Sequence, residues 1–234
     1  MALGSALPAP GEKAAVVRAM FDRIAPRYDR LNAVLTCGLD GRWRRAALAA
    51  AALSPGDRAL DLACGTGDLA ALAAAVGAVA LGVDFAPAML AVARRRRPEA
   101  WLVRGDAAAL PVASSSMDAV LCGFALRNFV AIEPVLAEAA RVLRPGGRLV
   151  LLEVATPRGR LARAAHRLYF ARVVPLLGAL LADRAAYAYL PRSVAYLPDA
   201  RTLLAMLAAA GFTEACVRPL ATHAAQLVTG RRAA

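Results

Sequence analysis

The chain has 234 residues, which suits one α/β domain with additions, and its formal net charge of +12 favours a polyanionic partner such as anionic lipid or nucleic acid. Its four cysteines form no C-x-x-C pair and have no neighbouring histidine ligands, so we expect reduced thiols and neither a disulfide framework nor a zinc site. Residues 1–11 lack the basic and apolar regions of a signal peptide, and no apolar run is long enough to span a bilayer, which predicts a cytoplasmic protein.

The N-terminal part is predicted to be helical after a disordered start. Residues 1–12 are rich in Ala, Pro and Gly and are expected to be disordered. Residues 13–33 read as a helix broken at Pro26, and residues 42–53 as a second helix that ends at Ser54-Pro55-Gly56.

From residue 59 onward, strands alternate with helices. The strands are expected at 59–63, 79–84, 101–105, 119–123, 149–154, 215–219 and 225–229, and the helices at 68–75, 87–96, 132–143 and 200–210. Pro145-Gly146-Gly147 should stop the third of these helices and turn the chain into the next strand. The pattern predicts a Rossmann-like α/β fold. Its seven-stranded, mostly parallel sheet carries helices on both faces, all within a single domain over residues 13–234.

The most informative segment is the run LDLACGTGD, which begins at Leu60. An apolar strand carries Asp61 near its end, and Gly65 and Gly67 would let the backbone pass close to a ligand. A second apolar run ends in Asp84, at roughly the 20-residue spacing that places a carboxylate beside a ribose diol. Asp68 stands where a pyrophosphate-binding helix would begin, which disfavours phosphate. The segment therefore indicates S-adenosyl-L-methionine (SAM), which carries a sulfonium and a ribose but no phosphate.

Residues 158–196 interrupt the alternation after the fifth strand. This segment is rich in Arg, aliphatic and aromatic residues. It could be a helical cap packed on the domain, or a lid that closes an apolar substrate pocket and touches the membrane surface.

Three runs outside the glycine loop carry a resemblance. They are MFDRIAPRYDRLN at 20–32 with Trp43-Arg44, GFALRN at 123–128 with RVLRPGG at 141–147, and Leu152-Glu153 with YAYLPRS at 187–193. Together with the loop they resemble the menaquinone/ubiquinone biosynthesis C-methyltransferase family, over the chain from about residue 14 to its end. The chain departs from that family at Asp40, where His is frequent, and at Gly123 and Ala155, where Ser is frequent.

The resemblance implies a class I SAM methyltransferase that yields S-adenosylhomocysteine. Asp84 should accept the ribose hydroxyls, Asp106 and Ala107 should read adenine, and Tyr28 should close over SAM. Asp106 could instead cap its own turn. The full set of implied SAM-binding residues is Tyr28, Asp61, Gly65, Thr66, Gly67, Asp84, Met89, Asp106, Ala107 and Gly123, with Thr66 at the methionine part and Met89 either on adenine or in the core.

The implied substrate is a prenylated quinol, whose hydroxyl ordinarily ionises only near pH 10. Arg127 is the candidate for stabilising the phenolate, and Asn128 for orienting the ring. Arg127 could instead form a structural salt bridge with Glu153. Asp29, His166 and Tyr187 are other candidate proton acceptors or positioning groups.

Several functions remain open at this point. The leading one is C-methylation of demethylmenaquinol, followed by a ubiquinone-pathway benzoquinol, both pathways together, and a small phenol. An RNA methyltransferase would show an added RNA module or an amino-methylation motif, and neither is present, so no nucleic-acid partner is expected. Peripheral contact with the cytoplasmic face of the inner membrane would suit a lipid-soluble substrate. The oligomeric state is open, a homodimer included.

Overall fold

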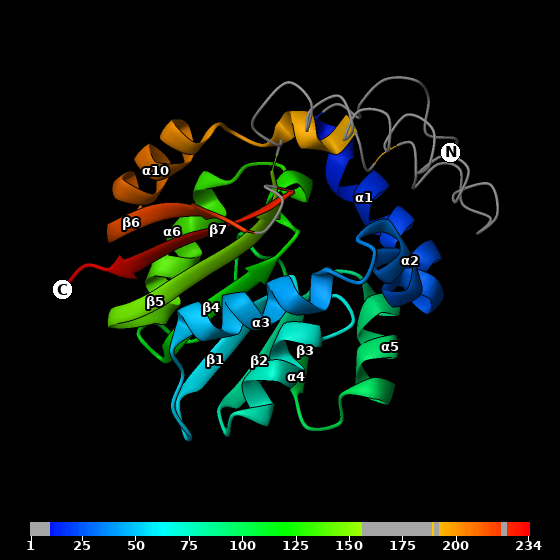
Figure 1. The fold of residues 1–234 in the computed structure, drawn as a ribbon, viewed down its shortest axis with the longest axis horizontal. Helices are drawn as coiled ribbons and strands as arrows, with labels where there is room; N and C mark the ends of the chain where they lie inside the picture. Colours follow the sequence, from blue (N-terminus) through cyan, green and yellow to red (C-terminus); the bar gives the residue numbers. More distant parts are fainter. Residues whose placement is uncertain (1–9, 156–188, 190–191, 221–223) are drawn as a thin grey trace.

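The computed structural model describes residues 10–155, 189, 192–220 and 224–234. Seven strands form one sheet in the order β3-β2-β1-β4-β5-β7-β6 (Figure 1). Strands β1 to β5 pair in parallel, and β7 is antiparallel to both of its neighbours. This confirms the predicted mostly parallel seven-stranded sheet. The strands are β1 (Arg58–Leu62), β2 (Val79–Asp84), β3 (Trp101–Arg104), β4 (Met117–Gly123), β5 (Leu143–Val154), β6 (Phe212–Pro219) and β7 (Ala225–Arg232).

The N-terminal helices precede the sheet. They are α1 (Pro10–Ile24), the 3₁₀ turn η1 (Ala25–Arg27), α2 (Tyr28–Leu35) and α3 (Asp40–Ala51). The predicted break at Pro26 is confirmed, because a proline ring cannot continue the α-helical hydrogen-bond ladder. Residues 10–12 were expected to be disordered and instead form the first turn of α1, with Pro10 at its first position, where a missing N–H costs nothing.

Helices cover both faces of the sheet (Figure 1). On one face, α3, α4 (Asp68–Ala75) and α5 (Pro87–Arg96) pack over β1 to β5. On the other, α6 (Glu133–Val142) packs against β5 and α10 (Ala200–Ala209) against β6. The 3₁₀ turns η2 (Leu126–Asn128) and η4 (Val194–Tyr196) lie above the carboxyl ends of the strands.

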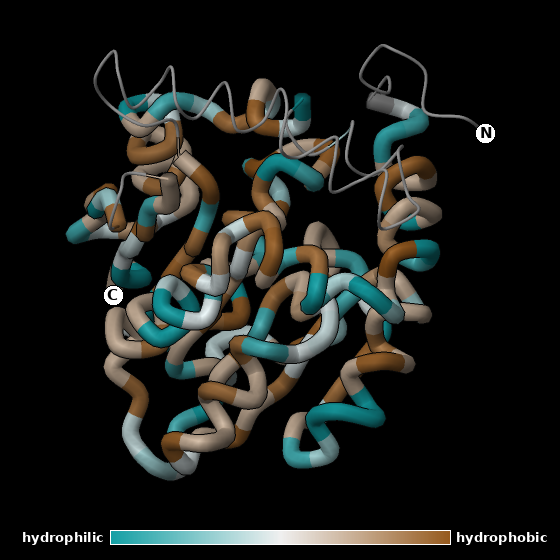
Figure 2. The backbone as a smooth tube through the Cα atoms, turned by 45° about the vertical axis from the view of Figure 1, so that its right-hand side comes forward, coloured by the Kyte–Doolittle hydropathy of each residue, from teal (hydrophilic) through white to brown (hydrophobic). Residues whose placement is uncertain are grey.

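Strand alternation divides the core in two. Val120 and Cys122 of β4 pack with α6 and α10, whereas Leu121 between them packs with α3 and α4. A period of two places successive side chains on opposite faces, so each buried strand supplies both cores. Hydrophobic segments run through the interior, and hydrophilic ones lie mainly around it (Figure 2). A third cluster joins α1 to α5 through Met20 and Met89.

The prediction of a turn at Pro145-Gly146-Gly147, between a helix and the next strand, is wrong in one respect. Helix α6 ends at Val142, and Leu143 already pairs with Met117 of β4. The next pair is Ala119 with Arg148, so the Pro-Gly-Gly run forms an irregularity inside β5 rather than a turn before it.

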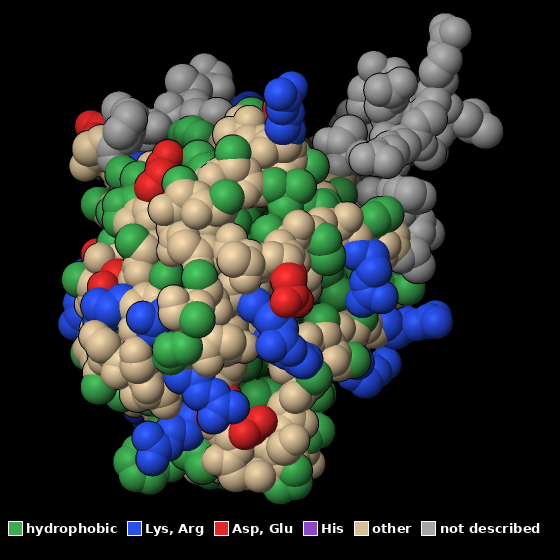
Figure 3. Space-filling view, turned by 90° about the vertical axis from the view of Figure 1, so that its left-hand side faces the viewer, with side chains coloured by type: hydrophobic (Ala, Val, Ile, Leu, Met, Phe, Trp, Pro, Cys, Tyr) green, Lys and Arg blue, Asp and Glu red, His purple; other side chains and the backbone are tan. Residues whose placement is uncertain are grey.

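The surface is strongly basic. Lys and Arg side chains occur in several separate groups over the face shown in Figure 3, with few acidic side chains between them. Within the described part of the chain, none of the helices has the length and apolar character required to cross a bilayer. Most of the predicted lid, and the whole of 156–188, lies outside the described residues.

Candidate active site

The chain turns sharply between β1 and α4, at Gly65 and Gly67. Their φ angles are +56° and +81°, in the left-handed region that residues with a Cβ rarely adopt. Gly65 lines a cavity, and its amide donates to Asp84 Oδ2 at 2.8 Å. Gly67 does not line it, and a Cβ at this position would meet Arg97 Cγ at 3.3 Å. The expectation that both glycines make room for a ligand is therefore corrected for Gly67, which serves the turn and its packing.

Asp61 faces α4 and not the cavity. Its Oδ2 accepts from the amide of Ala70 at 2.9 Å, and burial raises the pKa of the carboxyl to about 7. Asp68 begins α4, but Arg97 and Arg44 pair with it at 2.9 and 3.5 Å. Its charge is thereby compensated, and its repulsion of a phosphate is weaker than the sequence suggested. Asp61 thus fixes the turn and the start of α4 and does not line the cavity.

Asp84 ends β2 and lies on the cavity wall. Its two oxygens accept from the amides of Gly65 and Ala86, each at 2.8 Å. Burial raises the pKa of this carboxyl, and hydrogen bonds from backbone amides oppose that shift. A carboxylate has about four lone-pair positions, so Asp84 keeps acceptor capacity for a diol.

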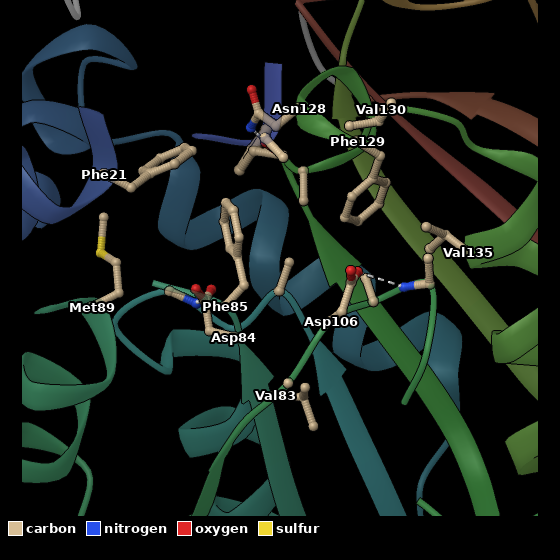
Figure 4. Close-up of a pocket in the computed structure, with 18 of the residues that line it drawn as sticks. Phe21, Val83, Asp84, Phe85, Met89, Asp106, Asn128, Phe129, Val130 and Val135 are labelled. Carbon is tan, nitrogen blue, oxygen red and sulfur yellow. Dashed lines mark hydrogen bonds between the residues drawn. The ribbon is translucent and has the colours of Figure 1, made fainter. Parts of the chain in front are cut away.

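This first cavity has a volume of about 340 Å³ and lies at the carboxyl ends of β1, β2 and β4 (Figure 4). Its walls are mostly apolar, as is usual for small-molecule sites. Sequence reasoning missed the apolar wall residues Phe21, Phe85, Phe129 and Val135. They come from α1, from loops and from α6, and in the sequence they look like ordinary core residues.

Asp106, Ala107 and Met89 also line the first cavity. Asp106 Oδ1 accepts from the amide of Ala108 at 2.9 Å, the bond dashed in Figure 4, so the turn-capping alternative is present together with cavity exposure. Met89 packs in the cluster between α1 and α5, as its core alternative predicts, and it also forms part of the cavity wall.

Tyr28 and Thr66 were both expected at the ligand, and only Tyr28 lines the first cavity. Tyr28 is held edge-on by Phe21, with ring centroids 5.9 Å apart. Thr66 is buried elsewhere, and its hydroxyl donates to Asp29 Oδ1 at 2.6 Å. Asp29 also forms an ion pair with Arg96. The structure therefore commits Asp29 to structural partners, which argues against a role as proton acceptor.

The predicted catalytic pair divides between two cavities. Asn128 lines the first one, where its Oδ1 accepts from the hydroxyl of Tyr189 at 3.3 Å. Arg127 is buried and donates to Glu153 Oε1, so the salt bridge considered as its alternative exists. Arg127 lines a second cavity on the other side of Phe124. The other two candidates, at positions 166 and 187, lie outside the described residues.

Gly123 ends β4 and lines the first cavity through its backbone. A Cβ at this position would meet Leu69 Cδ1 at 3.0 Å and Arg44 Nη1 at 3.6 Å. A side chain there would therefore point toward α3 and α4 and not into the cavity.

The chain is similar to known methyltransferases over most of its length. The sequence pattern of the ubiE/COQ5 methyltransferase family matches residues 10–230. The demethylmenaquinone methyltransferase of Thermus thermophilus is 48% identical over 83% of this chain and 91% of its own length. That of Roseiflexus sp. is 44% identical over 96% of each. The ubiquinone/menaquinone biosynthesis C-methyltransferase of Geobacter sulfurreducens is 40% identical over 94% of this chain and 90% of its own.

Solved structures share the fold at low sequence identity. A methyltransferase in complex with the Trm112 activator of Haloferax volcanii superposes with a TM-score of 0.68 at 18% identity, covering 92% of this chain and 98% of the other. A TehB-like SAM-dependent methyltransferase of Corynebacterium glutamicum gives 0.60 at 18% identity, with the same coverage. These likenesses identify the sheet order and helix arrangement as those of SAM-dependent methyltransferases.

Proposed function

Because the chain belongs to the ubiE/COQ5 methyltransferase family, we propose that this SAM-dependent methyltransferase converts demethylmenaquinol to menaquinol. The observation that carries the substrate is the 48% identity to a relative named demethylmenaquinone methyltransferase. A second relative of that name is 44% identical over 96% of this chain. The mostly apolar walls of the site suit a hydrophobic aromatic substrate.

A ubiquinone-pathway benzoquinol is the second candidate. It is favoured by the relative from Geobacter sulfurreducens, which is named for both pathways and is 40% identical. An enzyme for either ring would need the same cofactor cavity, so the two candidates differ only in the quinol that is accepted.

The first cavity suits SAM, which supplies a sulfonium methyl group when it is bound. Asp84 would accept the ribose hydroxyls, because its two existing amide bonds leave lone pairs unused. Asp106 and the Ala107 amide would lie at the adenine, and Gly65 and Tyr28 would lie against the rest of the SAM molecule. The turn between β1 and α4 would be stabilised, on the side away from the cavity, by Asp61, Thr66 and Gly67.

Methyl transfer is a displacement at carbon. A ring carbon of the quinol uses its electron pair to bond to the methyl carbon, the carbon–sulfur bond breaks, and its pair stays on sulfur to give S-adenosylhomocysteine. The ring carbon then loses its proton and the ring regains aromaticity, so each turnover releases one proton. Holding the two reactants in line supplies much of the rate.

Arg127 and Asn128 would act on the quinol. An oxygen with growing phenolate character is stabilised by a guanidinium, and Arg127 retains N–H donors beyond the one used by Glu153. Burial raises the pKa of Tyr189 to about 12, so its hydroxyl stays protonated and donates to Asn128 Oδ1. That bond fixes the orientation of the Asn128 amide.

The test is methyl transfer from radiolabelled SAM to chemically reduced demethylmenaquinone, with a reduced demethylated ubiquinone precursor alongside. Transfer to the naphthoquinol alone is the expected result, and transfer to both would establish a dual enzyme. No transfer to either quinol, with SAM still bound, would refute the proposed substrate but leave the family assignment intact.

A further inference from the structure

The second cavity lies beside the first and shares a wall with it. Its volume is about 280 Å³, close to the lower end of the range for ligand sites. Phe124 lines both cavities, and the consecutive residues Arg127 and Asn128 line one each. The two cavities are therefore adjacent, and Phe124 lies at the boundary between them.

Phe124 occupies this boundary at a backbone cost. Its φ is +59°, in a region that is unusual for a bulky residue with a Cβ. Outliers of this kind concentrate at functional sites, where the surrounding structure enforces them. Here Phe124 N donates to Leu152 O at 2.7 Å, and its ring lies 6.2 Å from that of Trp43.

The walls of the second cavity are apolar, with a few polar groups among them. Leu39 and Trp43 come from the segment around the start of α3, and Ala155 follows β5. Asn32 also lines the cavity, and its amide nitrogen, Nδ2, is buried and has no hydrogen-bond partner among the described residues. An unsatisfied buried donor is costly, and a ligand oxygen that accepted from it would remove that cost.

We infer that the second cavity holds the quinol ring, with Asn32 as a positioning residue that donates to one quinol oxygen. The inference rests on the proposed function and deepens it. An aromatic ring with an oxygen at each end matches apolar walls that carry the Asn32 amide and the Arg127 guanidinium. In this position the reacting ring carbon would lie at the boundary that the two cavities share, and it would reach the SAM methyl group there.

The first test measures binding of a naphthoquinone to the second cavity, independently of catalysis. The chain has two tryptophans, of which Trp43 lines the second cavity and Trp101 is 74% exposed at the start of β3. In a Trp101→Phe background, 2-methyl-1,4-naphthoquinone should quench Trp43 fluorescence with a saturable dependence on its concentration. Ala155→Phe, which fills the cavity, should abolish saturation. Ala33→Phe adds the same bulk at an exposed position outside the cavity and should leave it unchanged.

The second test reads the role of Asn32 in turnover. Asn32→Leu removes the donor, and Asn32→Asp keeps the shape but offers only acceptors. Both should raise KM for demethylmenaquinol by about tenfold and leave Kd for SAM within about twofold. Unchanged KM in the folded Asn32→Asp variant would overturn the inference.

The outcomes separate the two proposals. Saturable quenching that Ala155→Phe removes, without any methylation of the naphthoquinol, would uphold the cavity assignment and refute the proposed substrate. Methylation with no saturable quenching, or with Ala155→Phe fully active, would overturn the cavity assignment and leave the proposed function standing.

Discussion

Three carboxylates are almost completely shielded from water, and each is compensated differently. Asp61, Asp84 and Glu153 are 3%, 6% and 0% exposed. Asp84 accepts from two backbone amides. Asp61 accepts from one amide and lies near Arg44. Glu153 accepts from Arg127 and from the amide of Val154. Charges buried in this way persist only when paired or hydrogen-bonded, so each marks a position where the local structure is tightly specified.

Asp84 is predicted to be needed for cofactor affinity. Asp84→Asn keeps the side-chain shape but replaces one acceptor oxygen with a donor, which conflicts with the Gly65 or the Ala86 amide. It also removes the negative charge that would strengthen the hydrogen bonds from the ribose hydroxyls. We expect Kd for SAM, measured by calorimetry, to rise by about 10²-fold, since hydrogen bonds to charged groups contribute roughly 1.5–3 kcal/mol. The exposed Glu99→Gln serves as the matched control. An affinity equal to that of the unmodified chain would exclude Asp84 as the ribose acceptor.

Asp61 is predicted to make stability depend on pH. Its folded pKa of about 7 lies above the ordinary value of roughly 3.9, so the folded state binds more protons between these two values. The free energy of unfolding therefore falls as pH rises from 4 to 7 and stays lower above 7. Asp61→Asn keeps an acceptor for the Ala70 amide and should reduce this fall, with Asp84 supplying the part that remains.

Urea unfolding at pH 4.5, 6 and 8 checks the Asp61 prediction, again with Glu99→Gln as control. Arg44, Asp68 and Asp84 all act electrostatically on Asp61, so they are left unchanged in both proteins. The same loss of stability with pH in Asp61→Asn and in the parent would contradict it.

Arg127 is predicted to act in turnover as well as in structure. Removing it alone would strand Glu153 as an unpaired buried charge, so the informative variant is the double change Arg127→Met with Glu153→Gln. We expect kcat to fall by about 10²-fold, as for loss of a charge-stabilising donor, with Kd for SAM nearly unchanged. Arg104→Ala, an exposed change on β3, is the control. Unaltered turnover in the folded double variant would show that Arg127 serves only the structural ion pair with Glu153.

At the scale of elements, periodicity and turn residues were enough to predict the strands and helices of the sheet, while side-chain direction was harder. Asp61 was expected at the ligand, yet it lies in β1 between Leu60 and Leu62. Strand alternation puts those two leucines in the core under α6, so Asp61 must face α4. The two-residue alternation of side chains along a strand was therefore enough to predict the direction of Asp61 from the sequence.

Contacts between distant segments could not be predicted in the same way. Thr66 bonds to Asp29, and Gly67 packs on Arg97, through the relative placement of α2, α4 and α5. Neither contact leaves a local pattern in the sequence. The second cavity is also built from segments far apart in the chain, and its polar group, Asn32, looked like one more residue of a family motif.

A side chain at Gly67, in the turn before α4, is predicted to destabilise the protein. Gly67→Ala puts a Cβ on a residue with φ of +81° and 3.3 Å from Arg97 Cγ. The left-handed conformation alone costs about 1–2 kcal/mol, so the thermal midpoint should fall by several degrees. Gly11→Ala is the matched control, because Gly11 lies in α1 with nothing within 4 Å, and it should raise stability slightly. Equal midpoints for Gly67→Ala and the parent would contradict the prediction.

At the scale of the whole molecule, charge is the dominant surface property. The net charge of +12 and the groups of basic side chains in Figure 3 suit attraction to an anionic bilayer, where a lipid-soluble quinol would reside. The proposal of peripheral membrane contact depends on this attraction and on the substrate.

Vesicle sedimentation tests this proposal. Vesicles containing phosphatidylglycerol should retain the protein at low salt, and vesicles of phosphatidylcholine alone should retain much less. Retention should decline as salt shortens the Debye length from about 30 Å at 0.01 M to about 8 Å at 0.15 M. Equal and negligible retention by both vesicles would count against membrane contact.

Lys13, the only lysine, is 4% exposed. Its Nζ donates to Phe129 O at 2.5 Å and lies 3.7 Å from the centroid of the Tyr196 ring, and burial lowers the pKa of the amine. One ammonium group thus fastens the first helix to the loop after η2 and to η4. Amine-reactive reagents would find a single side-chain target in the whole chain, and in the folded protein that target is shielded. The rate at which Lys13 is acylated would consequently report how often the first helix lifts off the rim of the site, with no label having been engineered into the protein.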